Sequence, residues 1–294
     1  MSIHQNQKVN SEALKERFFD FYQDFFASHD MVVSNGYYIE PLPNMGWRAG
    51  APVIAVKLAL RAYLGMSVTE NPGEIIINRQ YLYDSKNDEI HDSDYDCLNF
   101  EKTLPYLKTY IKELAGNQEI PGFKFDIFCE MPEDRGLNVG ISTLFTLALL
   151  IHFGHIPHDA VSAITNVTAK ELQKQSTKEA KWFRQIIIDS CKIRSMSLHG
   201  ASSGIADYAS MVHSDFPIVF FTQERAGSEQ LPVKDLPPLY LDNKKDEFDN
   251  FTFWGFRLNE LVDLSGDYPF DFASIYPGTN TEFRASSESI RYAI

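Results

Sequence analysis

The sequence predicts an α+β fold, in which strands and helices surround one apolar helix. Several segments alternate apolar and polar residues as strands do, and others repeat apolar residues at helical spacing. The most apolar stretch, Val139 to Ile156, follows a strand-like segment across a short loop. A length of 294 residues with 44% hydrophobic content is enough to bury a substantial core.

The amino-terminal part of the chain predicts one helix and then a strand-rich region. Apolar residues at helical spacing behind a capping Ser11 predict a helix from about Ser11 to Ser28. The segments "MVVSNGYYIEPLP" and "GEIIINRQYLYD" are strand-like, whereas "APVIAVKLALRAYLG" mixes strand and helix signals. A polar loop, "DSKNDEIHDSDYD", follows.

Helices dominate the next part of the chain. The segment "FEKTLPYLKTYIKELAG" predicts a helix that ends on Gly116 and tolerates Pro105 only near its first turn. "GFKFDIFCEMP" alternates like a strand, and two more helical segments, "HDAVSAITNVTAKELQKQ" and "STKEAKWFRQIIIDSCKI", follow the apolar run. From Gln223 to Asn250 the composition becomes polar and includes proline, which predicts an insertion or a linker.

Charge and cysteine content exclude several classes of function. The chain has 40 acidic and 27 basic residues, so its net charge of −13 opposes sequence-independent binding to nucleic acid or anionic lipid. An anionic small molecule could still bind in a locally positive pocket. The three cysteines are widely spaced, which disfavours a disulfide framework and a zinc knuckle. The amino terminus has no apolar secretory segment, and a cytoplasmic location is expected.

The apolar run is predicted to be a buried helix rather than a membrane span. A spanning helix needs about 20 uninterrupted apolar residues, and this run is shorter and breaks at Gly154 and Pro157. It also contains four polar residues: Ser142, Thr143, Thr146 and His152. A helix that is apolar on all sides is typical of a protein interior.

Two groups of potential metal ligands are not expected to bind metal. The acidic loop has aspartates at the first three ligand positions of a calcium loop, but Cys97 replaces the required Gly and Thr103 replaces the bidentate Glu. The aspartates concerned are Asp92, Asp94 and Asp96. Three histidines at intervals of three residues would line one face of a continuous helix, but Gly154 and Pro157 interrupt that helix. These histidines are His152, His155 and His158.

The loop before the apolar helix is a candidate anion site. A strand from Phe123 to Glu130 leads through a Pro-acid-acid-Arg-Gly loop into the helix, whose amino terminus offers unpaired N–H groups and a partial positive charge. Gly136 and Gly140 permit a close approach of the backbone, and Arg135 could neutralise a phosphate. Hydroxyl groups for hydrogen bonding or for a metal are present at Ser142 and Thr143. An ordinary capped turn remains the alternative.

A second loop supports the phosphate interpretation. The segment "SLHGASSGIADYASMV", from Ser197 to Val212, is rich in small and hydroxyl-bearing residues and delivers Asp207 into another predicted helix.

Together the two loops resemble the GHMP kinase superfamily, which includes galactokinase, homoserine kinase, mevalonate kinase and phosphomevalonate kinase. "PEDRGLNVGIS" is similar to the family's phosphate loop, P-x-x-x-G-L-G-S-S-A-A, and "HGASSGIAD" is similar to its later H-G-x-P-S-G-I-D loop. "GAPVIAVKLALRAYLGMSV" and "FDFASIYPGTNTEFRASSESI" resemble further family segments in the same order. The resemblance covers most of the chain from Gly36 to Ile294.

The resemblance implies a fold, a division into domains and an activity. The fold is the ribosomal protein S5 domain 2-like amino-terminal domain of a GHMP kinase, with the carboxyl-terminal domain only begun or missing. The implied division is a helical extension at 1–30, the ATP-binding domain at 31–222, a polar insertion or linker at 223–250 and the start of a second domain at 251–294. The implied activity is ATP-dependent and Mg²⁺-dependent phosphorylation of a hydroxyl or phosphate on a small molecule.

The site residues follow from the same resemblance. Asp207 would be the candidate acid or base. A metal contact from Ser142 rests on the presence of its hydroxyl in the loop and not on the family pattern. The nucleotide would contact Arg135, Gly136, Leu137, Asn138, Gly140, Ser142 and Thr143. The substrate would contact His199, Ser202, Ser203 and Gly204.

Departures from the family pattern leave a second interpretation open. Asn138, Val139 and Gly140 stand where the family has G-S-S, and Ala206 stands at the family's aspartate, one residue before Asp207. The family's first motif and its G-x-G-G-G-G segment have no clear counterpart. The alternative is a catalytically decayed protein that binds a nucleotide or metabolite as a regulatory or structural subunit.

Overall fold

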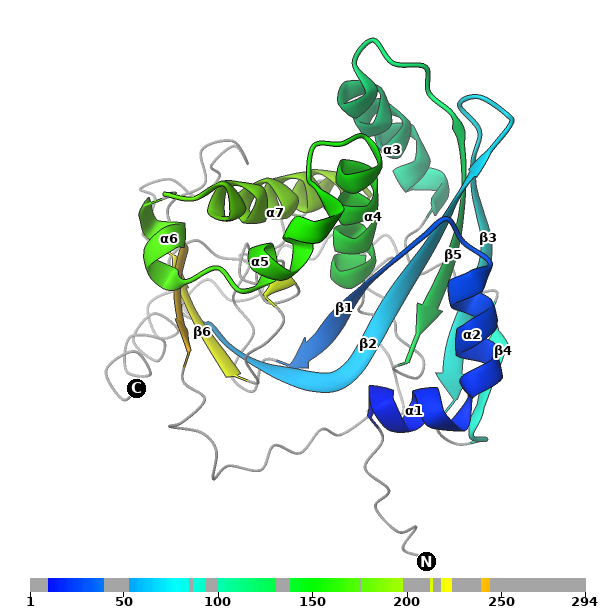
Figure 1. Cartoon of the computed structure of the whole chain (residues 1–294), viewed down its shortest axis with the longest axis horizontal. Coiled ribbons are helices and arrows are strands. Elements are labelled where there is room, and N and C mark those ends of the chain that lie inside the picture. The colour runs from blue at the N-terminus through cyan, green and yellow to red at the C-terminus, as the bar shows by residue number, and fades with distance from the viewer. Residues whose placement is uncertain are drawn as a thin grey trace, which may run out of the picture.

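The fold was obtained as a computed structural model of the whole chain (Figure 1). It describes residues 10–39, 53–84, 87–93, 100–130, 138–174, 176–197, 212–213, 218–223 and 239–243. The strands are β1 (Met31–Ile39), β2 (Val53–Thr69), β3 (Ile75–Asp84), β4 (Glu89–Asp92), β5 (Gly122–Cys129), β6 (Ile218–Gln223) and β7 (Leu239–Asn243). The helices are α1 (Ser11–Arg17), α2 (Phe19–Ala27), α3 (Phe100–Ala115), α4 (Asn138–His152), α5 (Val161–Thr165), α6 (Ala169–Lys174) and α7 (Lys178–Ser197), with a 3-10 turn η1 (His158–Ala160).

Within the described residues, seven strands form one mixed sheet in the order β4-β3-β5-β2-β6-β7, and β1 pairs with β2. Only β3 and β5 are parallel among these pairs. β2 is a 17-residue strand that joins the whole sheet, because its first residues pair with β6 and its later residues pair with β5. The mixed helix and strand signals of this segment therefore resolve to a strand.

The main core lies between the sheet and helices α3 to α7, and α4 is at its centre. Leu144, Ala148 and Leu149 of α4 are fully buried, and α4 packs against β1, β2 and α7. In Figure 1, α3, α4 and α7 lie on one side of the sheet, whereas α1 and α2 lie on the other. The prediction of a buried central helix from Val139 to Phe153 is thus confirmed. None of the described helices is long and apolar enough to cross a membrane.

A second, mainly aromatic layer joins α1 and α2 to the opposite face of the sheet. Tyr22 and Phe25 of α2 pack against Tyr63 of β2 and Phe128 of β5, with the rings of Tyr63 and Phe128 stacked 5.5 Å apart. The large buried area of these rings and their edge and stacked contacts stabilise the docking of the two helices.

The predicted helix from Ser11 to Ser28 is wrong in two details. It divides at Phe18, whose φ of −111° and ψ of 39° are not helical. The break allows Phe18 to contact Tyr83 edge-on while α2 lies on the middle of the sheet. The cap is Asn10, whose side chain accepts a hydrogen bond from the Ala13 amide, so that Ser11 is a helical residue.

Other sequence expectations have mixed outcomes. α3 ends before Gly116, which takes the left-handed φ of 57° as the expected terminator. The stretch predicted as a linker, 223–250, contains β7, which pairs with β6 in the main sheet. The division into domains stays a prediction, since most of the chain after residue 223 lies outside the described residues.

Candidate functional site

The candidate site is the amino-terminal end of α4, which β5 reaches through residues 131–137. α4 has 15 residues and is buried from Gly140 to Leu150 except at Leu147, so the partial positive charge at its first turn lies close to the protein interior. The first turn of α4 carries no acidic residue. In contrast, α1, α2, α3, α6 and α7 each place an Asp or Glu there. No first-turn carboxylate therefore offsets the charge at the head of α4.

Asn35 of β1 ties this helix end to the sheet. Its Nδ2 donates a hydrogen bond of 2.9 Å to the Gly140 carbonyl, and Asn35 is 94% buried, with 6% of its surface exposed. This bond fixes the orientation of the amide, because the flipped form would place two oxygens together. Asn35 Oδ1 then has no hydrogen-bond partner within the described part of the chain. Asn35 Oδ1 is therefore a buried acceptor on the residue that holds the first turn of α4.

The structure describes four of the predicted nucleotide contacts. Asn138 and Gly140 lie in the first turn of α4, and Gly140 is held by Asn35. Ser142 and Thr143 are buried, with 0% and 2% of their surface exposed. Their hydroxyl groups are therefore not accessible to solvent in this structure.

The remaining predicted site residues lie outside the described residues: Arg135, Gly136, Leu137, His199, Ser202, Ser203, Gly204 and Asp207. The segment that contains Asp207 is followed by two described residues, Val212 and His213, which are both buried. His213 Nε2 lies 3.3 Å from the Val167 carbonyl and its ring contacts Phe183. The carboxyl end of the "HGASSGIADYASMV" segment thus reaches the main core.

The three histidines considered as metal ligands have separate surroundings. His152 packs edge-on against Phe123, and His155 Nε2 lies 2.9 Å from the Leu114 carbonyl. His158 begins the η1 turn. Within the described ranges, no group of three potential ligands is placed to hold a metal ion.

A buried carboxylate lies where β5 ends, and sequence reasoning missed it. Glu130 Oε1 accepts hydrogen bonds from Ser11 (2.7 Å), Tyr22 (2.7 Å) and Tyr63 (2.9 Å), and Oε2 accepts one from the Arg61 amide (2.6 Å). Burial, followed by the charge of Glu130, raises the pKa of both tyrosines, which therefore remain hydrogen-bond donors. The polar positions of the alternating segment "FKFDIFCE" are the signal that could have indicated a shared polar face.

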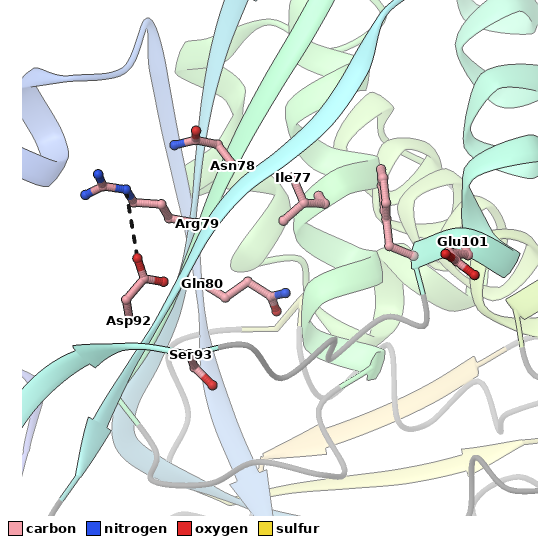
Figure 2. Close-up of a pocket in the computed structure, with 8 residues that line it drawn as sticks. Ile77, Asn78, Arg79, Gln80, Asp92, Ser93 and Glu101 are labelled. Atoms are coloured by element: carbon pink, nitrogen blue, oxygen red, sulfur yellow. Dashed lines mark ion pairs between the residues drawn. The ribbon is translucent and has the colours of Figure 1, made fainter.

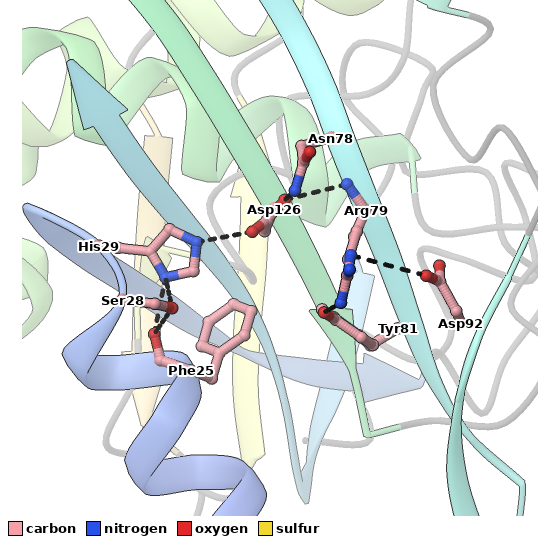
Figure 3. Close-up of polar contacts among 8 residues, drawn as sticks. All are labelled: Phe25, Ser28, His29, Asn78, Arg79, Tyr81, Asp92 and Asp126. Atoms are coloured by element: carbon pink, nitrogen blue, oxygen red, sulfur yellow. Dashed lines mark hydrogen bonds and ion pairs between the residues drawn. The ribbon is translucent and has the colours of Figure 1, made fainter. Parts of the chain in front are cut away.

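A second buried polar group joins α2 to the sheet (Figure 3). His29 Nε2 lies 2.9 Å from Asp126 Oδ2, and its Nδ1 lies 2.6 Å from the Phe25 carbonyl. Asp126 Oδ1 accepts further bonds from the Asn78 side chain and the Arg79 amide. The His29 ring covers Gly65 so closely that an added Cβ there would lie 2.5 Å from it.

Both nitrogens of His29 therefore face oxygen acceptors, which is the pattern of a charged imidazolium. Burial lowers the pKa of His29, but its hydrogen bonds with Asp126 and Phe25 outweigh burial and hold the pKa above the ordinary 6.5. Burial likewise raises the pKa of Asp126, but hydrogen bonds from His29 and Asn78 outweigh it and hold the pKa below 3.8.

The pair is expected to make stability depend on pH. The contribution of His29 is fully present below pH 6.5 and is lost as pH rises through its raised pKa, and that of Asp126 is lost as pH falls through its lowered pKa. His29→Gln can keep one hydrogen bond but cannot titrate. Urea unfolding should show a loss of about 1 to 3 kcal/mol at about pH 6 and a smaller loss at about pH 9. An equal loss at both pH values would contradict the charged pair.

A separate cavity of about 400 Å³ lies where β3 and β4 meet the start of α3 (Figure 2). Its lining is mostly polar: Ile77, Asn78, Arg79, Gln80, Asp92, Ser93, Phe100 and Glu101. Arg79 and Asp92 form an exposed ion pair of 3.9 Å, which contributes little. The cavity contains none of the predicted site residues.

Comparison with known proteins finds similarity in structure but not in sequence. No protein-family model matches the chain, and no curated protein matches it. Solved structures do match. Mevalonate kinase from Staphylococcus aureus is 16% identical with a TM-score of 0.40, and the match covers 64% of this chain and 51% of that one.

Two further matches belong to the same group of enzymes. Galactokinase from Lactococcus lactis is 15% identical with a TM-score of 0.38, covering 78% of this chain and 50% of that one. Phosphomevalonate kinase from Streptococcus pneumoniae is 10% identical with a TM-score of 0.37, covering 72% and 57%. The chain spans about half the length of the kinases it matches. The predicted α+β class is confirmed by the described helices and the mixed sheet themselves.

Proposed function

We propose that the chain is a divergent GHMP-type kinase, which uses ATP and Mg²⁺ to phosphorylate a hydroxyl or phosphate group on a small molecule. The observation that carries this proposal is the head of α4. There a helix with a buried core face begins without a first-turn acid at Asn138, nine residues after Cys129 at the end of β5. This part of the sequence resembles the family's phosphate loop.

The physical basis is the binding of an anion by a helix terminus. The first turn of α4 presents N–H groups that have no partner within the helix, and the helix that they terminate is buried from Gly140 onward at most positions. A chain with a net charge of −13 repels phosphate in general, so a nucleotide needs such a local positive site. Arg135 would add a full positive charge beside it.

The described residues fit a magnesium nucleotide in part. Asn35 Oδ1 is a buried oxygen without a partner among the described residues. Mg²⁺ prefers oxygen ligands, and the waters bound to Mg²⁺ donate hydrogen bonds to oxygen acceptors. Ser142, whose hydroxyl was considered for a metal contact, is buried. When bound, the metal would supply neutralisation of the phosphate charge, and Ser142 could contribute only if its hydroxyl became accessible.

The acid or base and the substrate are proposed from the second loop. Asp207 would accept the proton of the attacking hydroxyl, as the acidic residue in the small-residue segment. The substrate would lie between the segments "HGASSGIAD" and "YYIEPLPN" and contact His199, Ser202, Ser203 and Gly204.

A second candidate function is binding without turnover. Three observations favour it: Val139 lacks the hydroxyl of the family's loop, Ala206 occupies the aspartate position, and Ser142 is buried. Loss of a metal-holding hydroxyl or displacement of a base would each cost the transition state roughly 2 to 4 kcal/mol, while the amide donors for phosphate would persist.

Two measurements on the full chain separate these functions. Calorimetric titration with ATP and Mg²⁺ measures binding, and a phosphotransfer screen over sugars, mevalonate and homoserine measures turnover. Binding with turnover supports the kinase, and binding without turnover supports the second function. The absence of binding would contradict both.

Arg135→Ala is expected to weaken the binding of Mg²⁺-ATP about tenfold without reducing stability, because it removes one charged hydrogen-bonding group from the phosphates. Arg79→Ala is the matched control, since Arg79 is exposed on β3 and pairs only weakly with Asp92. Titration calorimetry and thermal unfolding check both variants. An unchanged affinity in Arg135→Ala, or an equal loss in Arg79→Ala, would count against the site.

A further inference from the structure

The two amino-terminal helices, α1 and α2, both donate hydrogen bonds to Glu130, the residue at which the chain leaves β5 toward the candidate site. Glu130 directly follows β5 and is completely buried. Three of its four hydrogen bonds come from hydroxyl groups, on α1 (Ser11), α2 (Tyr22) and β2 (Tyr63). The fourth comes from the Arg61 amide of β2, and the Glu130 amide donates in return to the Arg61 carbonyl at 3.0 Å.

Packing alone does not require a carboxylate at this place. The surrounding layer is aromatic, formed by Tyr22, Tyr63 and Phe128, and the carboxylate adds polar contacts to it that ring packing does not need. No ion pair of Glu130 occurs within the described ranges, so four hydrogen bonds replace the water that the carboxylate loses on burial. A fully satisfied buried network of this kind specifies one position, since any shift leaves a buried charge with fewer donors.

We infer that Glu130 is a positioning residue. Through Glu130, Ser11 and Tyr22 of the amino-terminal helices hold the end of β5. They thereby fix the point from which the chain continues to residues 131–137 and the head of α4. We call the hydrogen-bonded group formed by Ser11, Tyr22, Tyr63 and Glu130 the clamp. The consequence for nucleotide affinity rests on the function proposed above, whereas the positioning of the strand end does not.

The chain offers a matched pair of variants for the test. Ser11→Ala combined with Tyr22→Phe removes two hydrogen-bond donors to Glu130. It keeps the ring at position 22 and therefore the packing of α1 and α2. Tyr83→Phe removes one tyrosine hydroxyl from the same aromatic layer, as Tyr22→Phe does, but the Tyr83 hydroxyl donates to Asp88 at 3.1 Å. A difference between these variants therefore reports on Glu130 and not on the loss of a hydroxyl from the layer.

Hydrogen exchange of the full chain without nucleotide is the primary readout. In the Ser11→Ala/Tyr22→Phe variant the amides of Arg61 and Glu130 should exchange about tenfold faster than in the wild type, whereas the amides of α7 should not change. In Tyr83→Phe all of these amides should keep their wild-type rates. Unchanged exchange at Arg61 and Glu130 in the double variant, or equal acceleration in Tyr83→Phe, would overturn the inference.

Titration of the same variants with Mg²⁺-ATP then tests the functional consequence. The double variant should bind about tenfold more weakly and Tyr83→Phe should bind as the wild type does. If the wild type binds no nucleotide, the proposed function fails while the exchange result still decides the clamp. If the wild type binds and the double variant binds equally well, the functional part of the clamp is wrong.

Discussion

Asp207→Asn is expected to reduce phosphotransfer by about 10²- to 10⁴-fold, because the amide cannot accept the proton of the attacking hydroxyl. Nucleotide affinity should change little, since the proposed phosphate contacts come from the head of α4 and from Arg135. Single-turnover phosphotransfer and calorimetric titration on the same protein separate the two quantities.

Asp92→Asn is the control for this variant. Asp92 ends β4 and its carboxylate is exposed, with only the weak Arg79 pair. The same loss of negative charge there should leave turnover unchanged. Equal activity in Asp207→Asn and the wild type would remove Asp207 from the mechanism and favour the interpretation of Asp207 as a helix cap.

Phe145→Ala is expected to lower the free energy of unfolding by about 3 to 5 kcal/mol. Phe145 is 1% exposed at the centre of α4, and its ring lies 4.7 Å from the ring of Phe125 on β5. The truncation leaves a cavity between the helix and the strand that bracket residues 131–137, so it should also weaken nucleotide binding. Urea denaturation with a far-ultraviolet signal measures the stability change.

Phe19→Ala is the matched control for the core variant. Phe19 of α2 is 55% exposed, and its truncation should change the free energy of unfolding by less than about 0.5 kcal/mol. A loss below about 1 kcal/mol in Phe145→Ala would contradict the assignment of α4 as the centre of the main core.

The helices and strands that could be predicted are those whose surroundings stay the same along their length, because the order of apolar and polar residues then repeats regularly. The side chains of β5 are buried or half-buried, those of β3 range from buried to exposed, and α4 is apolar on all sides because most of it is surrounded. The sequence of β2 showed both helix and strand patterns, because β2 pairs with β6 at its start and with β5 at its end. The break at Phe18 depends on the shape of the aromatic layer beneath it, which no local pattern records.

The site could be predicted only in part for a similar reason. The glycines and the apolar run mark the head of α4 within a short stretch of sequence. Asn35 and Glu130 acquire their roles from partners about a hundred residues away, Gly140 in one case and Ser11 and Tyr22 in the other. Contacts at such separations arise from sheet pairing and helix docking, and a single sequence contains no direct signal for them.

The central claim is that phosphate binds at the amino-terminal end of α4. A crystal structure of the full chain with a non-hydrolysable ATP analogue and Mg²⁺ tests it most directly. The account predicts phosphate oxygens within about 3.2 Å of the first-turn amides of α4, with Arg135 directed toward them. Phosphates bound elsewhere, for example in the cavity between β3 and α3, with the head of α4 covered by protein, would contradict it.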